Sequence, residues 1–162
     1  TNSLYGGDQR YRLCQEAVLG LGGMKLLAKV GYTNIQGYHM NEGHSSLLAL
    51  GLLERRLDQS FAGRVKTLDI DSVRRLCIFT THTPVPAGHD EFPRSLVEQV
   101  LGEDRVKLLD ETHVFRGDKL NMTYLALTFS GYVTGSPCGM ARFRATCFRR
   151  TSLALSPMAF TP

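Results

Sequence analysis

Polar side chains gather in two short segments of the sequence, and each segment follows an apolar run. The shared types are imidazole, carboxyl, amide and hydroxyl groups, in Asn41, Glu42, His44, His82, Thr83, His89 and Asp90. Imidazoles can bind hydroxyl groups or move protons, and the carboxyl and amide groups can exchange hydrogen bonds with a polyol. The two segments therefore indicate a hydroxyl-rich ligand such as a sugar, without specifying which.

Simpler structural roles stay open for the same residues. Asn41 or Ser45 can cap a helix, and the His89–Asp90 pair can fasten its own proline-rich loop. His82, His89 and Asp90 match no recognised zinc-ligand spacing, so we expect no metal site. A metal-dependent hydrolase built on those three residues remains an alternative.

The elements that position these side chains alternate between helices and strands. Apolar residues at helical spacing predict a helix over 8–30, with Asp8 as its cap and Gly31 at its end. Short apolar runs predict strands at 35–40 and 77–81. Further helices are expected at 47–57, 69–75, 94–101 and 121–133, and a turn or helix at 103–111. This order predicts an α/β fold with a parallel sheet and helices on its faces.

Ligands of open parallel sheets bind outside the carboxyl ends of the strands. Each polar segment directly follows one of the two predicted strands. If the strands are parallel, both segments face one crevice, which is the site that the sequence predicts.

Charge and cysteine usage limit the class of protein. The net charge is +4, and residues 134–162 hold four arginines and no acidic residue, so the whole surplus lies there. The remaining chain has no basic stripe, so we expect no nucleic-acid partner. No apolar run is long enough to span a bilayer, so we expect no membrane partner.

The four cysteines form no Cys-x-x-Cys pair, which indicates buried thiols in a reducing compartment, the cytoplasm.

Four motifs in this order resemble the α-glucan (glycogen/maltodextrin) phosphorylases, and the short prokaryotic branch most closely. They are Leu4-Tyr5-Gly6-Gly7-Asp8, Arg12-Leu13-x-Gln15-Glu16, His39-Met40-Asn41-Glu42-Gly43-His44, and Thr80-Thr81-His82-Thr83-Pro84-Val85-Pro86-Ala87-Gly88-His89-Asp90. The segment Asn121-Met122-Thr123-x-Leu125-Ala126-Leu127 fits as well. The resemblance covers about residues 4–133.

The resemblance implies a GT-B glycosyltransferase with two Rossmann-like lobes and the active site between them. Residues 1–133 would form part of the N-terminal lobe. The implied reaction transfers the terminal α-1,4-linked glucose of a glucan to phosphate and yields glucose 1-phosphate. The implied cofactor is pyridoxal phosphate, whose phosphate group acts as an acid and base. The oligomeric state stays open.

The resemblance also implies roles for individual residues. His82 would contact the glucose that is transferred, with Thr83 beside it. Asn41, Glu42 and His44 match a substrate-binding turn near the acceptor end of the glucan, with Glu42 where the long branch has Asp. Asp8 matches the acidic residue of a gate loop, which is shorter here.

The chain departs from the family pattern in two ways that affect its expected activity. The family's Schiff-base lysine lies in the other lobe, and nothing in this chain matches that motif, so we expect the isolated chain to be inactive. A non-catalytic glucan-binding remnant is the alternative. The resemblance breaks off near 134, and a one-base shift with suitable codons turns 139–162 into family motifs. We therefore predict that 134–162 is a frameshifted tail without a fold of its own, against a genuine basic tail.

Overall fold

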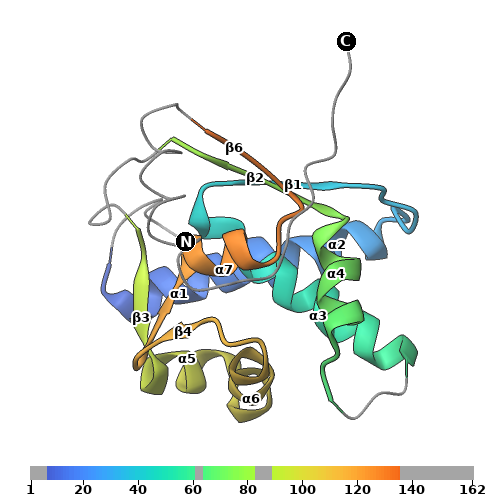
Figure 1. Ribbon diagram of the computed structural model, residues 1–162. Helices are drawn as coiled ribbons and strands as arrows, with labels where there is room; N and C mark the ends of the chain where they lie inside the picture. Colours follow the sequence, from blue (N-terminus) through green and yellow to red (C-terminus); the bar gives the residue numbers. More distant parts are fainter. Residues whose placement is uncertain (1–6, 61–63, 83–88, 136–162) are drawn as a thin grey trace.

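A computed structural model of the chain describes residues 7–60, 64–82 and 89–135, which form two small sheets and a set of helices (Figure 1). The first sheet is parallel, in the order β1 (Tyr38–Asn41), β2 (Cys77–Thr81), β6 (Tyr132–Gly135). The second is antiparallel, in the order β3 (Glu91–Pro93), β5 (Lys119–Asn121), β4 (Phe115–Arg116). The predicted parallel sheet is therefore confirmed.

The N-terminal helix is continuous over the predicted range. It consists of α1 (Gln9–Ala17), a π-helical segment η1 (Val18–Gly22) and α2 (Gly23–Lys29). Asp8 caps it, because its Oδ1 accepts a hydrogen bond of 2.8 Å from the Tyr11 backbone N–H. Gly31 follows its end with φ +97°, a conformation that favours glycine. Both end signals that the sequence predicted are confirmed.

Helices α3 (Leu47–Ser60) and α4 (Thr67–Arg74) connect β1 to β2, as a parallel pair requires. Gly20 lets the π-helical segment approach α3 closely. A Cβ atom at Gly20 would lie 2.6 Å from the Leu48 backbone nitrogen. The packing of this helix on α3 therefore requires a glycine at position 20.

The connection from β2 to β6 differs in part from the prediction. Helices α5 (Arg94–Leu101) and α6 (Glu103–Glu111) are where we expected them. The predicted helix over 121–133 is wrong in its second half, because α7 (Met122–Thr128) ends early and β6 follows. Gly131 N–H donates to the carbonyls of Arg74 and Cys77, which turns the chain into the sheet. Pairing with β2 thus outweighs the helical pattern.

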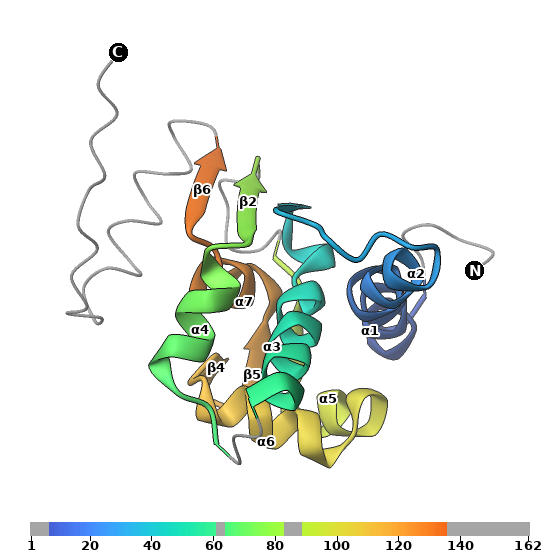
Figure 2. The same cartoon turned by 90° about the vertical axis from the view of Figure 1, so that its right-hand side faces the viewer.

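The helices gather on one side of the parallel sheet (Figures 1 and 2). Along β1, Tyr38 and Met40 are buried while His39 and Asn41 are exposed. Ile78 of β2 is 38% exposed and Tyr132 of β6 is 62% exposed. Among the described residues the other face is thus largely uncovered, whereas a doubly wound sheet has helices on both faces.

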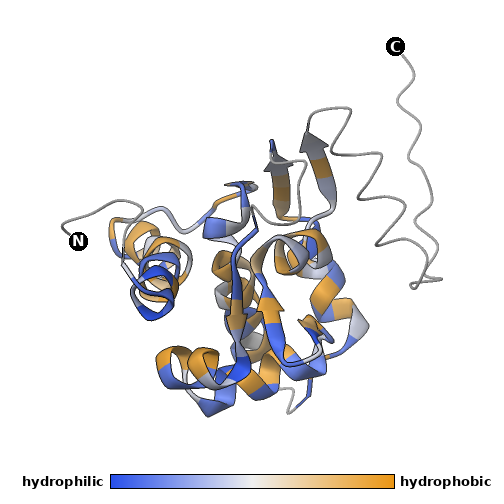
Figure 3. Cartoon of the chain, turned by 90° about the vertical axis from the view of Figure 1, so that its left-hand side faces the viewer, coloured by the Kyte–Doolittle hydropathy of each residue, from blue (hydrophilic) through white to orange (hydrophobic). Residues whose placement is uncertain are grey.

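The N-terminal helix carries exposed apolar side chains. Val18, Leu26 and Val30 are at least 60% exposed and lie at four-residue spacing or its multiples, so they share one helix face. Figure 3 shows orange segments on this helix, beside the label N. Contiguous apolar surface usually marks a contact with another element or partner.

Three further predictions concern the burial of the cysteines, membrane-spanning helices and the C-terminal tail. The prediction of buried thiols is confirmed for Cys77, and burial raises the pKa of its thiol to about 12. It is wrong for Cys14, which is exposed, and Cys138 and Cys147 lie outside the described residues. The described part of the chain contains no helix that is both long and apolar enough to cross a membrane. Of the predicted tail, Thr134 and Gly135 belong to β6, and 136–162 lie outside the described residues.

Candidate functional site

Glu42 joins the carboxyl ends of β1 and β2. Its Oε2 accepts a hydrogen bond of 3.1 Å from Thr81 Oγ1, and its Oε1 accepts one of 2.5 Å from the His82 backbone N–H. Its own backbone N–H donates to the Thr80 carbonyl at 2.8 Å. The two polar segments therefore meet at one edge of the sheet, as the sequence predicted.

The backbone of Glu42 is strained. Its φ is 61° and its ψ is 176°, in a region that is essentially reserved for glycine. Such a conformation costs on the order of 1–3 kcal/mol and persists only where surrounding contacts hold it. Here those contacts are the three hydrogen bonds to β2 and His82. Strain of this kind clusters at functional sites, so it supports a binding role for this turn.

A second cluster joins helix α1 to both polar segments. Arg12 Nη2 donates to Asp90 Oδ2 at 2.7 Å and lies 3.3 Å from His44 Nδ1. Arg12 Nε donates to Glu16 Oε1 at 3.3 Å, and His44 Nδ1 lies 3.4 Å from Asp90 Oδ2. Arg12 therefore connects the turn after β1 with the end of the loop after β2.

Glu16 is the buried member of this cluster. Its side chain is 2% exposed, and its Oε2 has no hydrogen-bond partner among the described residues. Burial, and after it the nearby Asp90 carboxylate, raise the pKa of Glu16 to about 8. The Arg12 guanidinium lowers this pKa but does not outweigh the two other effects. At neutral pH the Glu16 carboxyl group therefore holds its proton.

The raised pKa of Glu16 predicts a pH-dependent stability. Between pH 4.5, the ordinary value, and about 8, the unfolded chain releases the Glu16 proton while the folded chain keeps it. The free energy of unfolding therefore falls as pH rises through this window, by at most about 1.4 kcal/mol per pH unit. Glu16→Gln, which cannot ionise, should remove this part of the slope. Chemical denaturation of both proteins across the window measures the difference, and equal slopes would contradict the prediction.

His89 lies beside these groups. Its Nδ1 is 2.8 Å from Thr123 Oγ1, at the start of α7. Burial lowers the pKa of His89, although the carboxylates of Glu42, Asp90 and Glu91 act to raise it. His89 therefore belongs to the same polar edge and is fastened to α7 through Thr123.

One group of potential metal ligands occurs among the described residues. It consists of Glu16, His44 and Asp90, which each offer a ligand atom within 4.8 Å of the others. Arg12 already places a positive charge between His44 and Asp90. A metal ion there would meet that charge at close range, which is unfavourable. In the described part of the chain, His82, His89 and Asp90 do not form such a group, so the zinc-hydrolase alternative gains no support.

The remaining predicted site residues have separate positions. Asn41 is exposed at the end of β1, and Asp8 caps the helix that carries Arg12 and Glu16. Thr83 lies outside the described residues. Gly43 packs against α7, since a Cβ there would lie 3.1 Å from the Thr123 nitrogen. Its small size thus serves a helix contact in this structure.

Sequence reasoning did not assign Arg12, Glu16 or Thr123 to the site. The spacing of Arg12 and Glu16 could have indicated that they form a pair, because they are four residues apart and face the same side of a helix. Their partner Asp90 is distant in sequence, so only the fold reveals what they bind. Ser45, a candidate helix cap, has a buried hydroxyl without a hydrogen-bond partner among the described residues.

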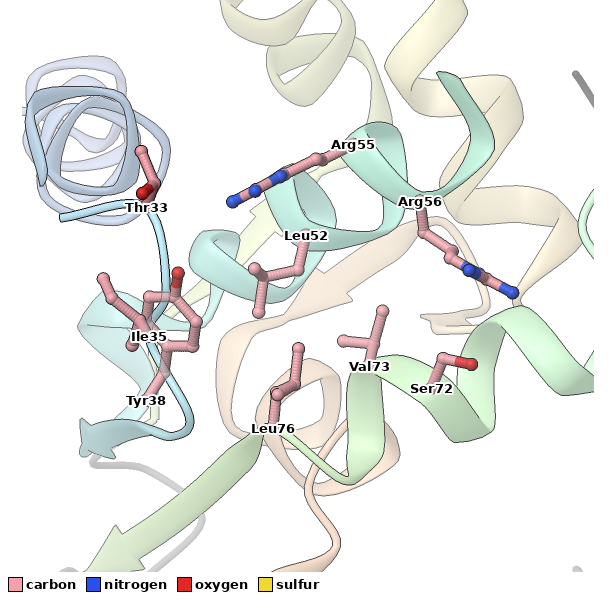
Figure 4. A pocket seen from close by; sticks show the side chains of 9 residues that line it. All are labelled: Thr33, Ile35, Tyr38, Leu52, Arg55, Arg56, Ser72, Val73 and Leu76. Carbon is pink, nitrogen blue, oxygen red and sulfur yellow. The ribbon is translucent and has the colours of Figure 1, made fainter. Parts of the chain in front are cut away.

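A cavity of about 240 Å³ lies at the opposite ends of the strands (Figure 4). Its lining includes Tyr38, which begins β1, and Leu76, which precedes β2. Arg56, also in its lining, is paired with Asp69 at 3.4 Å. The volume is below the usual range of about 300–1,000 Å³ for ligand pockets. None of the polar-edge residues around Glu42 lines the cavity, so the two are distinct.

Comparison with known proteins identifies several relatives. No family model matches the chain. It is 38% identical over 115 residues to the glycogen phosphorylase of Mycobacterium tuberculosis, which covers 65% of this chain and 12% of that protein. It is 37% identical over 133 residues to the maltodextrin phosphorylase of Thermococcus litoralis, covering 80% and 16%. For the glycogen phosphorylase of Aquifex aeolicus the identity is 30% over 142 residues, covering 82% and 20%. The matched region is thus a fifth or less of the length of these relatives.

Proposed function

The chain belongs to the family of glycogen and maltodextrin phosphorylases, of which it matches one segment. We propose that it forms part of the N-terminal lobe of such an enzyme. The proposed whole enzyme is a cytoplasmic GT-B glycosyltransferase. It transfers the terminal α-1,4-linked glucose of a glucan to phosphate and releases glucose 1-phosphate. Residues 1–133 are the proposed lobe segment, and 134–162 the proposed frameshifted tail.

The observation that carries this proposal is the strained turn at Glu42. A non-glycine residue with φ 61° is held by both of its carboxylate oxygens against the end of β2. This geometry fixes Asn41, Glu42, His44 and His82 at one sheet edge, where α/β folds bind ligands. We propose that His82 contacts the transferred glucose, with Thr83 beside it. Asn41, Glu42, His44 and Asp8 would serve the rest of the glucan.

The proposed cofactor, pyridoxal phosphate, does not fit the residues of this chain. All five lysines are exposed, and two of them, Lys107 and Lys119, are paired with glutamates. None can supply a buried Schiff-base nitrogen at the polar edge. The cofactor and the groups that hold the substrate phosphate would come from the rest of a whole enzyme. We therefore propose that the isolated chain does not catalyse phosphorolysis.

A chimaeric enzyme tests this proposal. Residues 7–135 would replace the matched segment of the Thermococcus litoralis maltodextrin phosphorylase, and glucose 1-phosphate would be measured with maltoheptaose and phosphate. We expect the chimaera to be active and the isolated chain to be inactive. In the chimaera, His82→Asn should lower kcat/KM by about a hundredfold, the size of a lost transition-state contact.

The matched control is His113→Asn, because His113 is exposed and follows α6, in another part of the fold. It has φ 56°, which asparagine tolerates. Equal activities of the two variants would contradict the role of His82. A chimaera that unfolds cooperatively like the parent but produces no glucose 1-phosphate would contradict the phosphorylase proposal. Binding of maltoheptaose by that inactive chimaera would favour the glucan-binding remnant.

A further inference from the structure

Arg12 lies where it can determine which ring nitrogen of His44 carries the proton. Its Nη2 atom lies 2.7 Å from Asp90 Oδ2 and 3.3 Å from His44 Nδ1. A guanidinium nitrogen only donates hydrogen bonds, and it is charged at all accessible pH values. The two N–H bonds of Nη2 can therefore serve Asp90 and His44 at once. For this to happen, His44 Nδ1 must accept.

We propose that Arg12 is a positioning residue that sets the tautomer of His44, so that Nδ1 accepts from Arg12 and Nε2 carries the proton. Asp90 fixes the guanidinium in this orientation through the shorter of the two contacts. Glu16 binds the Nε atom of the same guanidinium at 3.3 Å and is almost fully buried, which restrains the plane of the group. Arg12 thus has two carboxyl partners, on Nη2 and on Nε, in addition to His44.

The rival arrangement is a direct pair between His44 and Asp90. Nδ1 and Oδ2 are 3.4 Å apart, close to the 3.3 Å between Nδ1 and Arg12 Nη2, so the choice between the two arrangements depends on the other contacts of these groups. In that arrangement Nδ1 would carry a proton that points at Asp90, and an Arg12 N–H would then face a histidine N–H. The 2.7 Å contact between Arg12 and Asp90 favours the first arrangement, because that carboxylate oxygen already accepts from a charged donor.

The tautomer matters because it decides which nitrogen of His44 is a donor. With Nε2 protonated, the side of the ring remote from Arg12 presents an N–H group. A glucan offers hydroxyl oxygens that can accept from it. This consequence for glucan binding rests on the proposed function, whereas the tautomer itself does not.

Nitrogen NMR of the histidine rings in the isotopically labelled full chain tests the proposal. Under mildly alkaline conditions we expect His44 to show the Nε2–H tautomer. Arg12→Met should shift it mainly to the Nδ1–H tautomer, since Nδ1–H can then donate to Asp90. Asp90→Asn should keep the Nε2–H form, because Arg12 remains as donor. The matched control is Arg10→Met, since Arg10 is exposed on the same helix, and it should change nothing.

The outcomes separate the proposal from its rival. An Nδ1–H tautomer in the unmodified chain, or an unchanged Nε2–H tautomer in Arg12→Met, would overturn it. If Arg12→Met fails to fold, the unmodified chain and Asp90→Asn still decide, because the rival predicts that Asp90→Asn shifts the tautomer. Titration with maltoheptaose is read separately. We expect about tenfold weaker binding in Arg12→Met. Absence of binding by every variant would contradict the proposed function and leave the tautomer result intact.

Discussion

Replacing Glu42 by alanine is expected to lower the free energy of unfolding by about 2–3 kcal/mol. The substitution removes two hydrogen bonds to a charged acceptor, from Thr81 Oγ1 and from the His82 backbone N–H. It also leaves the strained backbone in place, since alanine has a Cβ atom like glutamate. The ends of β1 and β2 then lose the side chain that joins them. Urea denaturation followed by circular dichroism measures the change.

Glu42→Gly is the matched control for the strain at this position. It loses the same two hydrogen bonds, but glycine adopts φ 61° without the steric cost. Part of this gain in stability is lost, because glycine increases the conformational entropy of the unfolded chain. We therefore expect Glu42→Gly to be more stable than Glu42→Ala by about 1 kcal/mol. If the alanine variant is the more stable of the two, the strained turn is not a property of the folded protein.

The same pair of variants connects stability with function. Both remove the carboxylate, so in the chimaeric enzyme both should lose glucan affinity to a similar extent, whatever their difference in stability. If Glu42→Gly regains glucan affinity, then glucan binding depends on the backbone conformation of the turn and not on the carboxylate. The carboxylate would then have a structural role, and the proposed contact of Glu42 with the glucan would be wrong.

Gly20→Ala is expected to destabilise the chain by about 1–3 kcal/mol. The new Cβ would lie 2.6 Å from the Leu48 nitrogen and 2.8 Å from the Leu47 carbonyl carbon. Both are backbone atoms of α3, so the helices must move apart and part of the core between them would open. Leu21 and Leu47 on either side of this contact are buried. Thermal and urea unfolding measure the loss.

Gly23→Ala, on the same helix, is expected to increase the stability of the chain. A Cβ at Gly23 meets nothing within 4 Å, and the position is helical. Alanine is a better helix former than glycine by up to about 1 kcal/mol, so this variant should be more stable than the unmodified chain. If both substitutions change stability in the same direction, the close approach at Gly20 does not limit the packing of the helix on α3.

Much of the fold follows from local patterns. The helix at 8–30 has helical periodicity, an Asp8 cap and a terminal Gly31, and each of these signals depends only on residues close to it along the chain. The strand at 77–81 is a short run of β-forming residues, and β2 has those bounds. The three strands of the antiparallel sheet escaped prediction because each has only two or three residues, too few for a period to be recognised.

The amino-acid sequence alone determined the order of the helices and of the strands β1 and β2, the two polar segments and the resemblance to phosphorylases, because each depends on residues near one another along the chain. Parallel pairing of β1 with β2, which brings Glu42 to Thr81 and His82, was expected from the topology of α/β folds. Only the tertiary structure decided that the chain after Thr128 becomes a strand. It alone also revealed that Arg12 and Glu16 join the site, since Asp90, which Arg12 binds, is more than seventy residues away. Contacts over such separations depend on how helix and sheet pack, and no local pattern encodes them.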